Sequence, residues 1–172
     1  MENREFTVGE KIIYCTHGIC IIEDIRSMSL SPALPEQPYY VLRECKRGSL
    51  IYVPVAGGAS RMRDIYDKET IDRIICGIRG RKMDWNSDRK ARTTLFKAII
   101  VEGLNEDLLL MIRCIKLRKK EIVDLNKKLS DSDDDLLQTA EQIVNEELSF
   151  VLGIDEREVG DYIRGIAEEK DA

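Results

Sequence analysis

Residues 6–25 read FTVGEKIIYCTHGICIIEDI, and this stretch decides how the fold begins. It holds two runs of β-branched and aromatic residues, at 11–15 and 19–25, which are typical of β-strands. Gly18 stands between the runs, where a glycine can take the positive φ of a tight turn. The stretch therefore predicts an antiparallel hairpin.

Three more short strands are expected after this hairpin, at residues 39–45, 49–53 and 61–65. Three prolines between residues 26 and 38 exclude regular strand pairing there and predict a loop. Five short strands joined by tight turns are typical of a small, highly bent barrel. The first third of the chain is therefore expected to form a β-barrel of the Tudor or SH3 kind.

The spacing of apolar residues changes from two to 3.6 after Asp67, which marks the start of a helical region. The first helix is expected to end within residues 77–80, a segment that holds two glycines. A second helix has its expected buried face at Ala91, Leu95, Ala98, Ile99 and Glu102. These periods predict that the rest of the chain is all helical.

Side chains that cap helix ends predict where the later helices begin. Asn105 is expected to cap one helix, and Ser132 with Asp135 forms a capping box for the next. Asp155 is expected to start a last short helix. The fold class is thus α+β, a small β-barrel followed by an all-helical domain. The expected divisions are residues 1–66 for the barrel, 67–80 for a connecting helix and 81–172 for the helical domain.

The net charge of −5 hides two basic segments. Residues 79–97 carry seven basic side chains against two acidic ones, and residues 113–128 carry the same numbers. From residue 130 onward, fourteen acidic groups stand against three basic ones. Salt screens charges over about 8–10 Å, so a phosphate responds to a nearby basic segment rather than to the net charge. The first segment is a candidate nucleic-acid surface. The second is either a second phosphate-facing surface or the solvated outside of a helix, and the latter interpretation is favoured.

No motif of an enzyme occurs in the sequence. Phosphate-binding loops, dinucleotide fingerprints and nucleophile elbows are missing, and the single histidine excludes most histidine-centred sites. Cys15, His17 and Cys20 would need a fourth ligand, such as Cys45, to hold a metal. The five cysteines are interpreted instead as buried reduced thiols. No enzymatic activity, cofactor or metal is expected.

The chain also lacks the marks of a membrane or secreted protein. No apolar run approaches the ~20 residues that a membrane-spanning helix needs. The first residues lack the apolar core of a signal peptide. The protein is therefore expected to be cytoplasmic.

Trp85, the only tryptophan, lies within the first basic segment. A large apolar ring at such a place often packs between parts of a protein. A flat ring flanked by cations also suits DNA, because the cations hold phosphates while the ring inserts at a groove or stacks on a base. The residues alone leave both interpretations open. The candidate DNA contacts are Trp85, Arg89, Lys90, Arg81, Lys82 and Arg92.

Several motifs together carry a family resemblance. They are Phe6-x-Val8-Gly9-Glu10-x-Ile12-x-Tyr14, His17-Gly18-Ile19-Cys20-x-Ile22, Tyr39-Tyr40-Val41-Leu42 and Val53-Pro54, followed by Arg63, Trp85, Arg89 and Lys90. These motifs resemble the CarD/CdnL family of bacterial RNA polymerase-binding transcription factors. The first domain of that family is shared with transcription-repair coupling factors. The chain departs from the family at Cys15, where proline is frequent, and at Tyr52, where a basic residue is frequent.

The resemblance implies a transcription regulator that docks on the RNA polymerase β subunit by strand pairing. It further implies that the tryptophan enters the minor groove at the upstream fork of promoter DNA and so stabilises the open complex. Association with the nucleoid would follow through the polymerase. The expected polymerase contacts are Tyr52, Ile51, Leu50, Arg26, Met28 and Arg47.

An alternative function is a protein–protein adaptor on RNA polymerase that makes no DNA contact. In that case Trp85 would lie in the core between the two domains. DNA binding that weakens with salt, and that favours forked over closed duplex, would separate the two functions. In either case the protein is expected to be monomeric when free.

Overall fold

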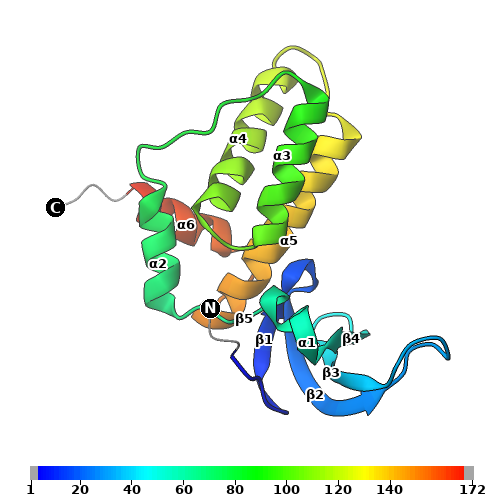
Figure 1. Cartoon of the computed structure of the whole chain (residues 1–172). Helices are drawn as coiled ribbons and strands as arrows, with labels where there is room; N and C mark the ends of the chain where they lie inside the picture. Colours follow the sequence, from blue (N-terminus) through cyan, green and yellow to red (C-terminus); the bar gives the residue numbers. More distant parts are fainter. Residues whose placement is uncertain (1–3, 169–172) are drawn as a thin grey trace. The chain divides into compact units, whose positions relative to one another are not determined.

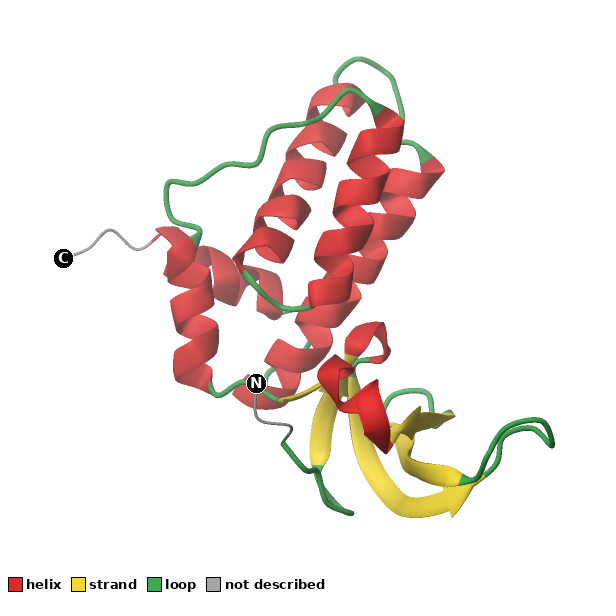
Figure 2. Cartoon of the chain, in the orientation of Figure 1, coloured by secondary structure: helices red, strands yellow, loops and turns green. Residues whose placement is uncertain are grey.

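The computed structural model describes residues 4–168 of the 172-residue chain. The chain divides into two compact units, Met1–Ile65 and Tyr66–Ala172. Figure 1 labels their elements, and Figure 2 shows that strands build the first unit and helices the second. This division confirms the α+β fold class that the sequence predicts.

The first unit is one five-stranded antiparallel sheet with the strand order β4-β3-β2-β1-β5. The predicted hairpin forms its centre, and Gly18 has the expected positive φ of 73°. A short turn of helix, α1, follows the fourth strand. The elements are β1 Lys11–Tyr14, β2 Ile19–Met28, β3 Gln37–Glu44, β4 Leu50–Pro54, α1 Val55–Gly58 and β5 Met62–Asp64.

One face of this sheet carries the apolar core of the first unit. Ile12, Ile22 and Leu42 are fully buried there. The register between β2 and β3 shifts between Ile22 and Asp24, and such a bulge bends a strand and increases its twist. β2 accordingly curves along its length in Figure 2. The long, bent second strand lets a small sheet fold around its own core.

The second unit packs five long helices around a larger core. Ile71, Ile75 and Ile78 are buried in that core. The segment expected to connect two domains therefore belongs to the helical unit, and the unit begins at Tyr66. None of the helices in the described residues is long and apolar enough to cross a lipid bilayer. The helices are α2 Lys68–Gly77, α3 Arg89–Glu102, α4 Glu106–Val123, α5 Asp131–Leu152 and α6 Val159–Glu168.

The buried face of α3 differs from the expected one. Phe96, Ile99 and Ile100 are buried, whereas Leu95 is 48% exposed. Of the face expected at Ala91, Leu95, Ala98, Ile99 and Glu102, only Ile99 is buried, so the rest of that face is wrong by about one residue. The physical reason is a buried arginine at position 92, which fixes the rotation of the helix because its charge is paired inside the unit.

Two helix starts also differ from the expected ones. α5 begins at Asp131, and Ser130 caps it by accepting a hydrogen bond from the backbone N–H of Asp133. The residues expected as a capping box, Ser132 and Asp135, therefore lie inside the helix. α6 begins at Val159, because Asp155 uses its carboxylate to hold the backbone N–H and the guanidinium of Arg157 in a preceding turn. Asn105 caps α4 as expected, at 2.8 Å from the backbone nitrogen of Leu108.

Candidate functional site

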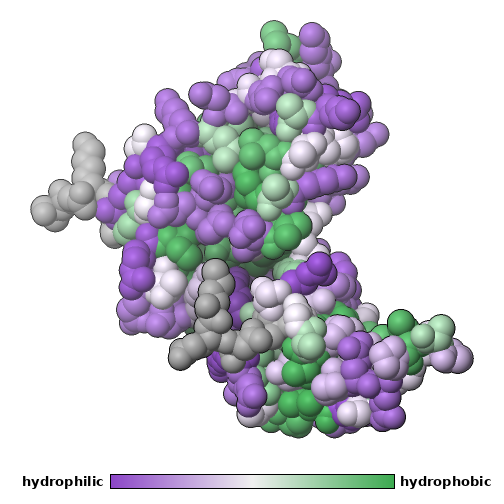
Figure 3. Space-filling model, in the orientation of Figure 1, coloured by the Kyte–Doolittle hydropathy of each residue, from purple (hydrophilic) through white to green (hydrophobic). Residues whose placement is uncertain are grey.

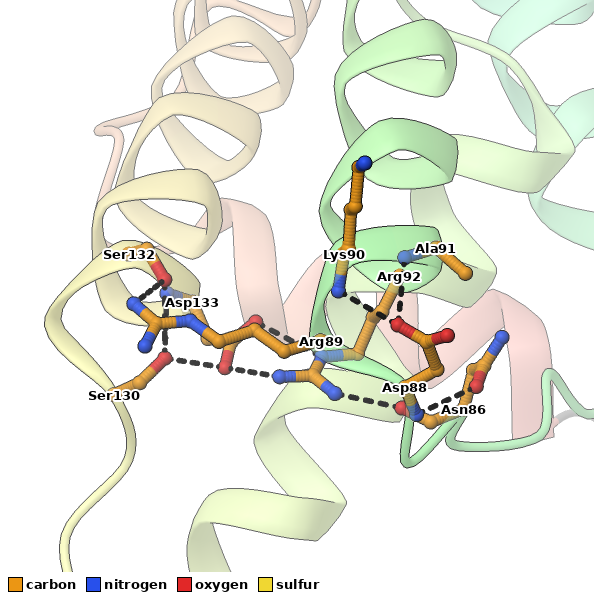
Figure 4. Close-up of polar contacts among 9 residues, drawn as sticks. All are labelled: Asn86, Asp88, Arg89, Lys90, Ala91, Arg92, Ser130, Ser132 and Asp133. Carbon is orange, nitrogen blue, oxygen red and sulfur yellow. Dashed lines mark hydrogen bonds and ion pairs between the residues drawn. The ribbon is translucent and has the colours of Figure 1, made fainter.

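Trp85 lies in the segment between α2 and α3, and local hydrogen bonds order its C-terminal side. The Asp88 carboxylate accepts hydrogen bonds from the backbone N–H groups of Lys90 and Ala91, at 2.9 and 3.1 Å, and so caps α3. The Asn86 side-chain oxygen accepts from the backbone N–H of Asp88 at 2.9 Å. Figure 4 shows these contacts at the start of α3. The segment is thereby fixed directly after the tryptophan.

The Trp85 ring is half-buried and touches cations. It packs edge-on against Phe96, with 6.3 Å between ring centroids. The Arg92 guanidinium lies 4.2 Å from the centroid of the Trp85 ring, and the Arg118 guanidinium lies 5.8 Å from it. Both distances are within the range of cation–π attraction. The indole thus serves the packing of the helical unit, yet it is still partly open to solvent.

Arg92 is a structural residue rather than a surface cation. It is only 5% exposed and donates two hydrogen bonds to Asp133, at 3.0 and 2.8 Å. It also donates to the backbone oxygen of Asn86 at 2.6 Å. These contacts use three of its five N–H donors, and the side chain is too deeply buried for a phosphate to reach it. The sequence-based expectation that Arg92 contacts DNA is therefore corrected: Arg92 holds the Trp85 ring from within.

The partner of Arg92 is held in its charged form. Burial raises the pKa of Asp133, but hydrogen bonds from Arg92 and Ser130 outweigh burial and hold this pKa below its ordinary value. A buried ion pair of this kind contributes little net stability when intact, but losing one partner is costly. The pair links α3 to the start of α5, and it also orients the guanidinium that covers Trp85.

A half-open cleft of about 140 Å³ lies beside Trp85. The segment before α3 lines one side of it, and α4 lines the other. Arg113 and Arg118 of α4 are therefore neighbours of the tryptophan, although the sequence interpretation places their basic segment on a solvated helix face. The only sequence signal is their spacing with Leu117, which puts these residues near one face of a helix. The lining residues are Lys82, Met83, Asp84, Trp85, Leu110, Arg113, Cys114, Leu117, Arg118 and Glu121.

The remaining candidate DNA contacts are exposed, but they differ in their freedom. Arg89 donates to the Ser132 hydroxyl at 3.1 Å, and the Lys90 side chain points away from the hydrogen-bonded group in Figure 4. Arg81 forms an ion pair with Glu106 at the start of α4 and lies 3.7 Å from Asp107. Its charge is thus largely neutralised in the free protein. Lys90 is the candidate of these three that is most available to a phosphate.

The first unit presents its candidate surface at one edge of the sheet. β4 pairs with β3 on one side, and no other described strand pairs with its second side. Ile51 and Val53 point toward the core of this unit, which places Tyr52 between them on the opposite face. The sequence alone leaves the direction of Tyr52 open, and the structure resolves it. Leu50 begins the same strand and is 44% exposed.

Three further residues are expected polymerase contacts, two of them on β2 and one in the turn before β4. Arg26 of β2 is opposite Tyr39 of β3, which is in turn opposite Pro54 of β4. Arg26 therefore shares the face of Tyr52, and so does Met28 two residues later. Arg47 is exposed in the turn before β4. The structure brings Tyr52, Leu50, Arg26 and Met28 to one face, whereas Ile51 lies on the other.

The side chains whose spacing could suit a metal site have other roles. The His17 ring nitrogen Nδ1 lies 2.7 Å from the buried carboxylate of Glu44, and the Cys15 thiol donates to the backbone oxygen of Arg61. No cluster of metal-ligating side chains occurs in residues 4–168. The expected burial of the cysteines is wrong for Cys45 and Cys76, which are exposed. These two thiols are exposed but belong to no cluster of metal ligands among the described residues, so they form no metal site.

Comparison with known proteins gives a family match within the first unit. Residues 6–66 match the CarD-like/TRCF RID domain, which corresponds to the five-stranded sheet. A protein of Bacillus subtilis named "Putative transcription factor YdeB" is 26% identical over 163 residues, which cover 91% of this chain and 99% of that protein. The similarity thus continues through the helical unit. The chain thus carries a CarD-like/TRCF RID domain at residues 6–66, as the motifs at its N-terminal end indicate.

Proposed function

We propose that the protein binds the β subunit of RNA polymerase and stabilises the open promoter complex through minor-groove contact at the upstream fork. The family and the name of the Bacillus relative support the coarser statement, a transcription-related role associated with RNA polymerase. The position of Trp85 supports the more specific statement, which is minor-groove contact at the upstream fork. Its half-buried ring lines the cleft among cations, which supports contact with DNA.

The edge strand β4 supports docking by strand addition. An edge strand offers backbone N–H and C=O groups to a strand of a partner, and side chains on alternate positions add specificity. β4 is five residues long and presents Leu50 and Tyr52 on one face. Tyrosine is frequent among residues that contribute most to protein interfaces. The first unit is therefore proposed to hold the polymerase.

The helical unit is proposed to hold the DNA. Lys82, Arg89 and Lys90 are exposed cations near the tryptophan in sequence, and Lys82 lines the same cleft. Minor-groove hydrogen bonding distinguishes bases poorly, so a wedge at this place selects distorted, forked DNA over a base sequence. A factor that binds the open state more tightly than the closed one shifts the equilibrium by that difference in affinity.

Trp85→Ala is expected to shorten the lifetime of the open complex while leaving polymerase binding intact. The change removes the apolar ring but none of the polymerase-facing residues. Challenge of preformed promoter complexes with a competitor measures the lifetime, and pull-down of the β subunit measures docking. Leu95→Ala is a matched control, because Leu95 is exposed on the next helix and lies outside the cleft. A folded Trp85→Ala protein with an unchanged lifetime would contradict the wedge.

Tyr52→Ala is expected to weaken binding to the β subunit by about tenfold, since truncation of an interface tyrosine commonly costs more than 1 kcal/mol. Binding of the purified full chain to the β subunit by calorimetry checks this. Ile25→Ala is the control. Ile25 is 38% exposed in the same sheet. Its neighbour Asp24 shares the face of Tyr52, and side chains alternate along a strand, so the Ile25 side chain points to the opposite face. Equal loss in both variants would show that the sheet itself, rather than this face, was damaged.

The adaptor without DNA contact is the second candidate function, and one observation favours it. Trp85 packs against Phe96 and under Arg92, so the ring already has a structural role. Binding of the full chain to forked and closed duplexes at several salt concentrations separates the candidates. The DNA-binding function predicts preference for the fork and an affinity that falls with salt. The adaptor predicts no measurable binding to either DNA.

A further inference from the structure

The cleft beside Trp85 combines an apolar interior with a charged rim. Met83, Leu110 and Leu117 supply the apolar lining, and Leu117 is 51% exposed. An apolar cavity of about 150 Å³ is known to hold one benzene ring. The cleft, at about 140 Å³, therefore has room for one six-membered ring. The surface of the helical unit in Figure 3 is mostly hydrophilic, with apolar side chains reaching it in places.

Two cations at this cleft are free to meet an anion. Lys82 and Arg113 are exposed, and neither forms an ion pair with any residue between 4 and 168. Arg118 differs, because it lies 3.2 Å from the Glu121 carboxylate and close to the Trp85 ring. An apolar slot for one ring with unpaired cations at its rim is complementary to a base and its phosphate. The packing of the helical unit alone does not require unpaired cations at this rim.

We propose that this cleft binds one unpaired pyrimidine base of a DNA single strand, with the adjacent phosphate on Arg113 and Lys82. The inference rests on the proposed function, because it requires that DNA reach Trp85, and it deepens that function by naming the strand element bound. The ring would lie against Leu110, Leu117 and the open part of the indole. A purine, with two fused rings, is larger than this volume and would leave part of its surface outside the half-open cleft.

The acidic lining residues further favour cytosine over thymine. Asp84 and Glu121 line the cleft, and both carboxylates raise the pKa of the Cys114 thiol, after the larger effect of its burial. Carboxylates accept hydrogen bonds from the exocyclic amino group of cytosine. Thymine has a carbonyl oxygen at that position, which a carboxylate repels. Arg118 pairs with the Glu121 carboxylate, which leaves Lys82 and Arg113 for the incoming phosphate.

The single tryptophan provides a direct measurement on the full chain. Titration with oligo-dC, oligo-dT and oligo-dA of equal length, followed by the emission of Trp85, gives three affinities. We expect oligo-dC to bind about tenfold more tightly than oligo-dT, given the worth of one base-specific contact, and oligo-dA to bind most weakly. Equal affinity for the three oligonucleotides would overturn the proposal. Equal affinity for oligo-dC and free dCMP would also overturn it, because the cleft would then serve a mononucleotide rather than a strand.

Substitutions of exposed cleft residues test the same inference without disturbing the core. Arg113→Gln is expected to lower the slope of log affinity for oligo-dC against log salt concentration by about 0.7, the value for one phosphate contact on a single strand. Leu117→Gln is expected to weaken oligo-dC binding at every salt concentration while keeping the slope. Arg73→Gln is the matched control, because Arg73 is exposed on α2 and does not line the cleft.

The outcomes separate this inference from the proposed function. If Arg113→Gln and Leu117→Gln bind oligo-dC like the unchanged protein, while Trp85→Ala loses its effect on the open complex, the cleft inference fails and the proposed function stands. If the full chain binds neither forked DNA nor any oligonucleotide, both fail. Weakened oligo-dC binding in the two cleft variants, with an unaffected Arg73→Gln control, supports the cleft as a base-binding site.

Discussion

Asp133→Asn is expected to lower the free energy of unfolding of the helical unit by about 3–5 kcal/mol, the usual cost of leaving a buried charge without its partner. Asp133 is only 1% exposed and accepts two hydrogen bonds from Arg92 and one from Ser130. The amide is neutral and offers a single acceptor oxygen, so the Arg92 charge would remain buried and uncompensated. Chemical denaturation followed by circular dichroism measures the loss.

The matched control lies two residues earlier in the same helical turn. Asp131→Asn removes an exposed carboxylate at the start of α5 and is expected to cost only about 0.3–1 kcal/mol through the helix dipole. Similar losses in the two variants would contradict a special role of the buried pair. Because Arg92 covers the indole, Asp133→Asn should also change the emission of Trp85, and Asp131→Asn should not.

The ion pair between Arg92 and Asp133 makes the stability of the helical unit depend on pH in the acidic range. The pKa of Asp133 in the folded protein lies below its ordinary value of about 3.9. A lowered folded pKa contributes stability that is present above pH 3.9 and is lost as the pH falls through the folded pKa. The unchanged protein should therefore lose stability below about pH 4, and Asp133→Asn should lose less in that range. Denaturation curves between pH 2 and pH 6 check this.

Phe96→Ala is expected to cost about 3–5 kcal/mol, the range for removing a buried phenylalanine from a packed core. Phe96 is 1% exposed, and its ring supports the edge of Trp85. The cavity left behind would also let water reach the indole, so the emission of Trp85 should shift to longer wavelength. Thermal or chemical denaturation measures the first effect, and a fluorescence spectrum of the folded variant measures the second.

The neighbouring residue supplies the contrast. Leu95→Ala is expected to change the free energy of unfolding by no more than about 0.5 kcal/mol, because the side chain is largely exposed and surface changes are usually small. A large loss at Leu95 and a small one at Phe96 would mean that α3 is rotated toward the face that its apolar spacing suggests. The two substitutions therefore test the orientation of the helix that carries Arg92.

The strands and the fold class could be predicted because their signals are local. Alternating strand formers, the three prolines and the glycine at position 18 act on neighbouring residues and need no partner to be interpreted. The predicted third strand at residues 39–45 is nearly the observed Gln37–Glu44. Capping residues were less decisive, because Ser130 and Ser132 are both good caps and only packing chooses between them.

The candidate site was only partly accessible to such reasoning. Trp85 and the exposed Arg89 and Lys90 follow from composition and sequence position. The burial of Arg92 depends on Asp133, which is 41 residues away in the chain. The cleft likewise depends on Arg113 and its α4 neighbours, which pack beside a segment about 30 residues earlier. The spacing of apolar residues along a sequence does not reveal contacts between residues this far apart in the chain.

The order of strands and helices, the family motifs and the place of the single tryptophan follow from local sequence, because each depends on adjacent residues. Folding sets which arginine is buried, which cations are free at the cleft and which face of β4 carries Tyr52. The physical reason is that a charge is inexpensive on the surface and costly inside. Its role is therefore set by the partner that folding brings to it, and that partner lies far along the chain.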